Sequence, residues 1–130
     1  MNSTTFVLHL NNGYEVVIVS EWKKTRDGFK HVSRAYRNGG EVGRDTSHYY
    51  NRTWEAYEFQ SSARGAVRDW EWNRREEVLR IFKIGYGYKR MTQKRWAEYY
   101  EHLNEDIEYN AAREALKALD KRPDTFSFAG

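Results

Sequence analysis

The 130-residue sequence predicts an α+β fold, with an N-terminal antiparallel sheet of three to four strands followed by two long helices. Two observations support this fold class. In the first half, apolar and polar residues alternate in short runs that end at turns containing Gly or Asn. In the second half, apolar residues recur every three or four positions, as they do along one face of a helix. The length suits one domain, which we expect to span residues 1–123, followed by a mobile tail over residues 124–130.

The first element is a predicted β-hairpin closed by residues 11–13. A three-residue loop with Gly13 in the left-handed conformation is a common hairpin closure. A two-residue loop would pair Leu10 with Glu15 and mix the two faces of the hairpin. We therefore favour the three-residue loop, which places six apolar residues on one face by pairing Leu10 with Tyr14, Leu8 with Val16 and Phe6 with Ile18.

Further strands follow. The second strand is expected to reach Trp22 and to break over residues 23–28, and a third strand is predicted over residues 29–36. Asn38-Gly39-Gly40 then turns the chain. Residues 41–52 are ambiguous, and residues 52–59 are a candidate fourth strand.

The first helix is expected to begin near Ser61 or Ser62, because either hydroxyl can cap a helix. Gly85 is a suitable end. Arg74 interrupts the apolar face, so the pattern leaves open a bend near Asn73. The apolar positions are Ala63, Ala66, Val67, Trp70, Val78, Ile81 and Phe82.

The last helix is predicted to start after Thr92 and to end at Lys121-Arg122-Pro123. Thirty helical residues would extend about 45 Å, which is long for a domain of this size. A break near Asn104 or Asn110, or a helix that projects toward a partner, would account for that length. The expected apolar stripe is Trp96, Tyr100, Leu103, Ile107, Ala111, Ala112, Leu116 and Leu119.

Charge is distributed unevenly along the chain. Residues 64–95 contain ten Lys and Arg against four acids, whereas residues 96–130 contain four basic residues against eight acidic ones. The basic segment also holds Trp70, Trp72, Tyr86 and Tyr88, and aromatic rings can stack on bases or fill a pocket in a partner. This combination favours a polyanionic or nucleoprotein partner.

The candidate partner-binding residues are the cations of this segment and the two tyrosines of its loop. They are Arg64, Arg68, Arg75, Lys83, Tyr86, Tyr88, Lys89, Arg90, Lys94 and Arg95. Two interpretations that involve no partner-binding site stay open. The cations could form a solvated helix face with local ion pairs, or the acidic last helix could neutralise them within one molecule or a homodimer. The acidic helix could also imitate a nucleic-acid backbone.

Composition excludes several classes of function. The chain has no cysteine, which rules out disulfides, thiolate nucleophiles and Cys-ligated zinc and fits a reducing compartment. No apolar run approaches the roughly 20 residues that span a bilayer, and the N-terminus does not resemble a leader. We expect a protein of the host cytoplasm, with no membrane partner and no cofactor.

Two constellations could carry chemistry. His48 and Glu55, with Arg52, could act as an acid–base pair and an anion stabiliser in phosphodiester cleavage. Glu98, His102 and Glu105 share one helix face and could ligate a divalent metal. Neither pattern includes the further ligands or orienting groups such sites need, so we expect no catalytic residue and no metal.

Residues 47–61 read SHYYNRTWEAYEFQS, and the surrounding segment 45–67 resembles part of short, mostly uncharacterised proteins of phages and mobile elements. Proteins of that background are often accessory factors, including inhibitors of host defence such as anti-CRISPR proteins. The resemblance implies a non-enzymatic inhibitor that binds a host nuclease or ribonucleoprotein complex. The alternative is an accessory protein that binds DNA or RNA directly through the same basic, aromatic surface.

Overall fold

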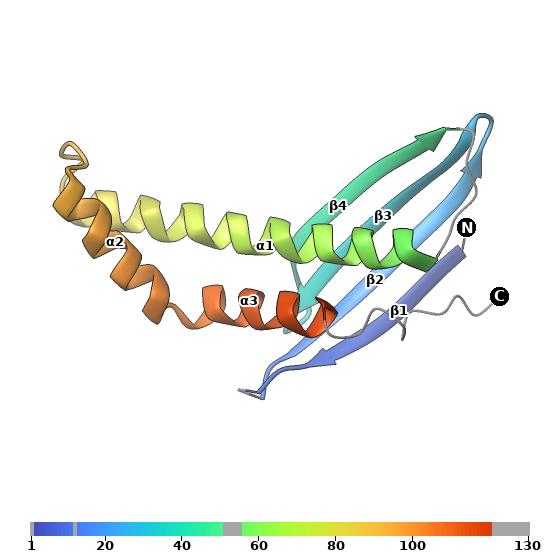
Figure 1. Ribbon diagram of the computed structural model, residues 1–130, viewed down its shortest axis with the longest axis horizontal. Helices are drawn as coiled ribbons and strands as arrows, with labels where there is room; N and C mark the ends of the chain where they lie inside the picture. The colour runs from blue at the N-terminus through green and yellow to red at the C-terminus, as the bar shows by residue number, and fades with distance from the viewer. Residues whose placement is uncertain (1, 12, 51–55, 121–130) are drawn as a thin grey trace.

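The computed structural model describes residues 2–11, 13–50 and 56–120, and it confirms the α+β class. Four strands pair consecutively into one antiparallel sheet, in the order β1-β2-β3-β4. Helices then cover one face of that sheet (Figure 1). The elements are β1 (Asn2–His9), β2 (Glu15–Thr25), β3 (Gly28–Arg37), β4 (Gly40–Tyr50), α1 (Ala56–Gly85), α2 (Gln93–Glu105) and α3 (Ile107–Asp120). The predicted tail and the end at residues 121–123 lie outside the described residues.

The register of the first hairpin is the predicted one. Leu8 pairs with Val16 and Phe6 with Ile18. The Leu10 amide donates to the Tyr14 carbonyl at 2.8 Å, and Gly13 has a φ of 84°. The three-residue loop is thus confirmed, because it alone keeps the apolar residues on the face that the helices cover.

The fourth strand differs from its prediction. β4 occupies Gly40–Tyr50, the segment that the sequence left ambiguous, and helix is already present from Ala56. A strand over residues 52–59 is therefore wrong, although residues 51–55 themselves lie outside the described part. β4 carries few apolar side chains, and at Gly43 the backbone of α1 approaches it directly. A Cβ built on Gly43 would lie 2.0 Å from the carbonyl oxygen of Ala66.

Helix α1 begins five or more residues before the predicted caps and continues through Asn73 without interruption. Ser62 is consequently buried within the helix rather than at its start. The helix ends at Gly85, as predicted. Beyond it, the Tyr88 amide donates to the Lys83 carbonyl at 2.8 Å and the Gly87 amide to the Ile84 carbonyl at 3.0 Å. These two bonds form a Schellman-type end that satisfies otherwise unpaired carbonyls.

The predicted last helix is divided at Asp106, close to one of the two expected break points. Thr92 caps its first part, since its hydroxyl accepts from the Arg95 amide at 3.3 Å. Asp106 then ends α2 and caps α3 by accepting from the Tyr109 amide at 2.8 Å. Its carboxylate also accepts two hydrogen bonds from the Arg74 guanidinium, at 2.8 and 2.7 Å. These bonds lower the pKa of Asp106 below its ordinary value.

The break changes which side chains of the last segment are buried. Tyr99 is buried in place of the expected Tyr100, which is 46% exposed, and Ile107 is 63% exposed. Ile81 of α1, also expected in the core, is 51% exposed. A single uninterrupted helical phase cannot describe two helices that meet at an angle (Figure 1), so Tyr100 and Ile107 depart from the predicted stripe. Of its other residues, Leu103, Ala111, Ala112 and Leu119 are buried as predicted.

Two apolar clusters hold the molecule together. The first joins the sheet, the inner half of α1 and α3, and several alanines in it let the helices approach closely. The second lies beyond the sheet and joins the outer half of α1 to α2 and the start of α3. Its members are Val78, Phe82, Tyr99, Leu103 and Tyr109. The outer part of the molecule is therefore a helical hairpin with a small core of its own.

A buried polar chain links the sheet to α1. The Ser20 and Ser33 hydroxyls are 2.5 Å apart, Ser33 also contacts the Ser62 hydroxyl, and Ser62 lies 2.9 Å from Nδ1 of His31. The His31 ring is 1% exposed and stacks on Tyr49. Because Ser62 is equally buried, this arrangement offers no access to a substrate and serves to fix α1 on the sheet.

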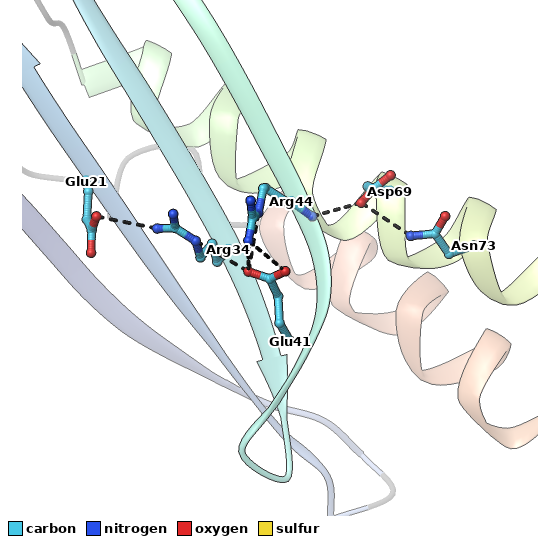
Figure 2. Close-up of polar contacts among 6 residues, drawn as sticks. All are labelled: Glu21, Arg34, Glu41, Arg44, Asp69 and Asn73. Carbon is cyan, nitrogen blue, oxygen red and sulfur yellow. Dashed lines mark hydrogen bonds and ion pairs between the residues drawn. The ribbon is translucent and has the colours of Figure 1, made fainter.

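The uncovered face of the sheet carries matched charges (Figure 2). Arg34 lies between Glu21 and Glu41, at 3.4 and 3.3 Å, and Arg44 contacts Glu41 at 2.9 Å. On the edge strand β4, the Arg44 amide donates to Asp69 of α1 at 2.8 Å. That bond occupies an edge N–H group that could otherwise pair with another chain.

We expect Asp106→Ala to lower the free energy of unfolding by about 2 kcal/mol, because it removes a helix cap and both bonds to a partly buried guanidinium. Asp106→Asn keeps a capping oxygen and should cost about half as much. Urea denaturation of the two variants measures the difference. Equal stability of Asp106→Ala and the unsubstituted protein would contradict this role of the helix junction.

Candidate binding surface at the end of the helical hairpin

The outer half of α1 continues past the edge of the sheet, and α2 returns alongside it (Figure 1). Residues 81–97 form the end of this hairpin, which we call the hairpin end. It comprises the last turn of α1, the loop and the first turn of α2. The hairpin end therefore projects from the body of the molecule, where a partner can reach it from several sides.

The hairpin end is strongly positive. Residues 81–97 contain five Lys or Arg and no Asp or Glu. None of these cations forms an ion pair with a residue in the described part of the chain. They are Lys83, Lys89, Arg90, Lys94 and Arg95. Unmatched cations on a projecting element attract a negatively charged surface.

Other cations of the basic segment form ion pairs within the chain. Two of them pair with the acidic last segment, which is the neutralisation within one molecule considered above. Arg64, a predicted site residue, pairs with Asp120 of α3. Arg74 pairs with Asp106 of that segment. Arg80 instead forms a local ion pair with Glu77 of α1, at 2.7 Å. Arg64 also lies 21 residues before Gly85, the last residue of the same helix, a separation of about 32 Å. We therefore remove Arg64 from the candidate site.

Two further predicted residues lie away from the hairpin end. Arg68 is exposed on the half of α1 that packs against the sheet. Arg75 is exposed near the middle of α1, and its backbone carbonyl accepts from the Tyr99 hydroxyl at 2.9 Å. Neither forms an ion pair within the described residues. The predicted site residues therefore do not form one surface. Arg64, Arg68 and Arg75 lie along α1, and the remaining predicted residues lie together at the hairpin end.

The two loop tyrosines differ in their surroundings. The Tyr86 hydroxyl donates to Glu98 at 2.9 Å, and the Arg95 guanidinium lies 5.0 Å from the centre of its ring. The hydrogen bond to Glu98 raises the pKa of Tyr86. Tyr88 is 71% exposed and has a positive φ of 57°. Tyr86 is therefore fixed in place, whereas the ring of Tyr88 is available for contact with a partner.

A cavity of about 370 Å³ lies between the outer half of α1 and α2, directly behind the hairpin end. Val78, Ile81 and Phe82 form its apolar wall. Arg74 and Asp106 line one end, Tyr86 lines the other, and His102 of α2 also lines the cavity. The sequence could not reveal this cavity, because it depends on the angle at which α2 returns along α1.

A second basic group, which the sequence did not single out, lies on the uncovered face of the sheet. Lys23 pairs with Lys30, and Lys30 pairs with His48, so the three side chains form a row across β2, β3 and β4. His48 stacks on Tyr50, which is 61% exposed. The periodicity of two along each strand could have indicated this row once the register was known.

The two constellations considered for chemistry remain incomplete. Glu55 and Arg52 lie outside the described residues, so no partner of His48 from that group can be placed. His102 contacts the Phe82 ring edge-on at 5.5 Å. No group of three or more His, Asp or Glu side chains in the described part of the chain is arranged to hold a metal ion.

None of the helices in the described part combines the length and apolarity needed to cross a bilayer. No protein-family model, curated protein or solved structure matches this chain.

Proposed function

We propose that this chain is a non-enzymatic binding protein that attaches to a negatively charged surface of a host nucleoprotein through its hairpin end. The resemblance to phage accessory proteins suggests inhibition of a defence nuclease as the purpose of this binding. The observation that carries the proposal is the set of five cations in residues 81–97 without an acid among them.

The contrast with the arginines on the uncovered face of the sheet supports this choice of surface. Arg34 and Arg44 on the uncovered sheet face are matched by carboxylates at 2.9–3.4 Å. At the hairpin end, by contrast, none of the five cations forms an ion pair with a described residue. A carboxylate or phosphate surface of a partner would supply the missing negative charge.

The test is a pull-down from bacterial lysate with the tagged protein, followed by mass spectrometry and a cleavage assay of the captured complex. We expect a nucleoprotein with nuclease activity that falls when more of the protein is added. In the variant Lys89→Glu/Arg90→Glu, we expect recovery to fall at least roughly tenfold, because two exposed cations at the tip become repulsive.

The matched control is Arg113→Glu/Lys117→Glu, which makes the same change in charge on two exposed residues of α3. It should recover the complex as well as the unsubstituted protein does. Equal losses from both double variants would reduce the effect to net charge and would overturn the proposed surface. Recovery of no specific complex would overturn the proposal as a whole.

Direct binding of nucleic acid is the second candidate, and the row formed by Lys23, Lys30 and His48 favours it. Basic side chains beside exposed Tyr50 could contact phosphates while the ring stacks on a base. Binding of this kind should weaken steeply as salt rises. An electrophoretic shift assay at low salt decides the matter, because absence of a shift with single- and double-stranded DNA and RNA excludes this candidate.

A further inference from the structure

The cavity behind the hairpin end is suited to an apolar guest. Arg74 gives two hydrogen bonds to Asp106, at 2.8 and 2.7 Å, so the charged groups at that end of the cavity are already satisfied. His102 and Tyr86 contribute the other polar lining atoms, and the rest of the wall, formed by Val78, Ile81 and Phe82, has no polar side-chain atom. A polar group placed against it would lose its hydration without gaining a hydrogen bond.

The volume of the cavity and the exposure of Ile81 further restrict the kind of guest that can bind. A volume of about 370 Å³ lies at the lower end of the roughly 300–1,000 Å³ typical of ligand sites, so it suits one large side chain better than an extended ligand. Ile81 lines the cavity and is 51% exposed. Its apolar surface is therefore open to solvent in the free protein, and a guest would cover it.

Tyr86 connects the cavity to the positive charge. Its ring lines the cavity, and Arg95 lies 5.0 Å from the ring centre. A peptide that inserts a side chain beside Tyr86 would carry its neighbouring residues toward the cations of the hairpin end. Acidic neighbours would be attracted there, whereas basic ones would be repelled.

We propose that the partner presents an acidic peptide segment with one large apolar side chain, and that this side chain occupies the cavity between α1 and α2. The proposal rests on the proposed function and specifies which part of the partner the hairpin end contacts. A nucleic acid fits less well, because a base carries polar edges and the wall of Val78, Ile81 and Phe82 offers them no hydrogen bonds.

The test uses a fluorescein-labelled peptide with a central tryptophan flanked on both sides by acidic residues, and the same peptide with a central serine. Fluorescence anisotropy with the full chain should show the tryptophan peptide binding at least roughly tenfold more tightly. Ile81→Gln should remove that preference. Ile84→Gln is the matched control, since Ile84 is 46% exposed on the same helix and lies outside the cavity lining.

Each outcome decides a separate question. Equal binding of both peptides would overturn the cavity proposal and leave attraction of acidic partners by the hairpin end intact. Binding of neither peptide would overturn the cavity proposal, and the lysate experiment would still decide the proposed function. A preference that survives Ile81→Gln would place the tryptophan elsewhere. Tighter binding of a duplex DNA competitor at low salt would assign the surface to nucleic acid instead. Thermal melts followed by circular dichroism confirm that both variants fold.

Discussion

Replacing Gly43 with alanine is expected to lower the free energy of unfolding by about 3 kcal/mol. A Cβ at this position would lie 2.0 Å from the Ala66 carbonyl oxygen and 2.7 Å from the Trp70 amide nitrogen. Both atoms belong to the backbone of α1, so neither can move without shifting the helix. The helix would have to separate from β4 at the point where the buried Trp70 ring completes the first apolar cluster.

Gly40→Ala is the matched control in the same strand. A Cβ at Gly40 meets only the Arg37 carbonyl oxygen, at 3.7 Å, which is an ordinary van der Waals distance. Urea denaturation should leave this variant within about 0.5 kcal/mol of the unsubstituted protein. If the two alanine variants were equally stable, the close approach of α1 to β4 would be incorrect.

Acidification is expected to destabilise the protein through His31. Burial lowers the pKa of His31 from 6.5 to about 4, so between these values the unfolded chain binds the proton and the folded chain does not. Stability should therefore be constant above pH 6.5 and fall as the pH is lowered toward 4. The loss from pH 7 to pH 4 is about 3 kcal/mol for this group alone.

His31→Gln removes the titrating group and should flatten that part of the pH profile, whatever it does to stability at pH 7. Substitution of the exposed His48 by Gln is the control and should leave the acid loss unchanged. The measurement is the midpoint of urea unfolding between pH 4 and pH 7.5. An acid loss of the same size in His31→Gln would assign the effect to other groups.

The sequence predicted the sheet best where one face is uniformly apolar. The alternation from Leu8 to Ile18 defines both the hairpin and its register, because any other pairing would expose apolar residues. The sequence did not predict β4, because this strand has no uniformly apolar face. At Gly43 the close contact is made by backbone, and a contact without a side chain leaves no apolar residue to detect.

In the predicted last helix, the apolar periodicity did not locate the break at Asp106. The apolar spacing continues across Asp106, yet the chain there uses the Asp106 carboxylate as a cap and turns to follow the sheet. Aspartate is favourable at helix starts, but a polar residue in the middle of a long periodic segment also suits a solvated position. Only the partner, Arg74 on another helix, distinguishes the two cases.

The sequence predicted the positive charge of the candidate site, but it predicted the position of that charge only in part. Local composition identified the basic segment, and the loop tyrosines were recognised as part of it. Composition cannot say which cations meet acids from distant parts of the chain. The pairs of Arg64 with Asp120 and of Arg74 with Asp106 join residues 56 and 32 positions apart, and both depend on the way α3 folds back along α1.

Because α1 is long, its two halves have different structural roles. Its inner half is committed to the sheet through Ala63, Ala66 and Trp70, whereas its outer half supports the hairpin end. Exposed residues of the loop can therefore be exchanged without disturbing the packing beneath the sheet. Such an arrangement lets the exposed side chains of the loop change by mutation while the scaffold stays constant.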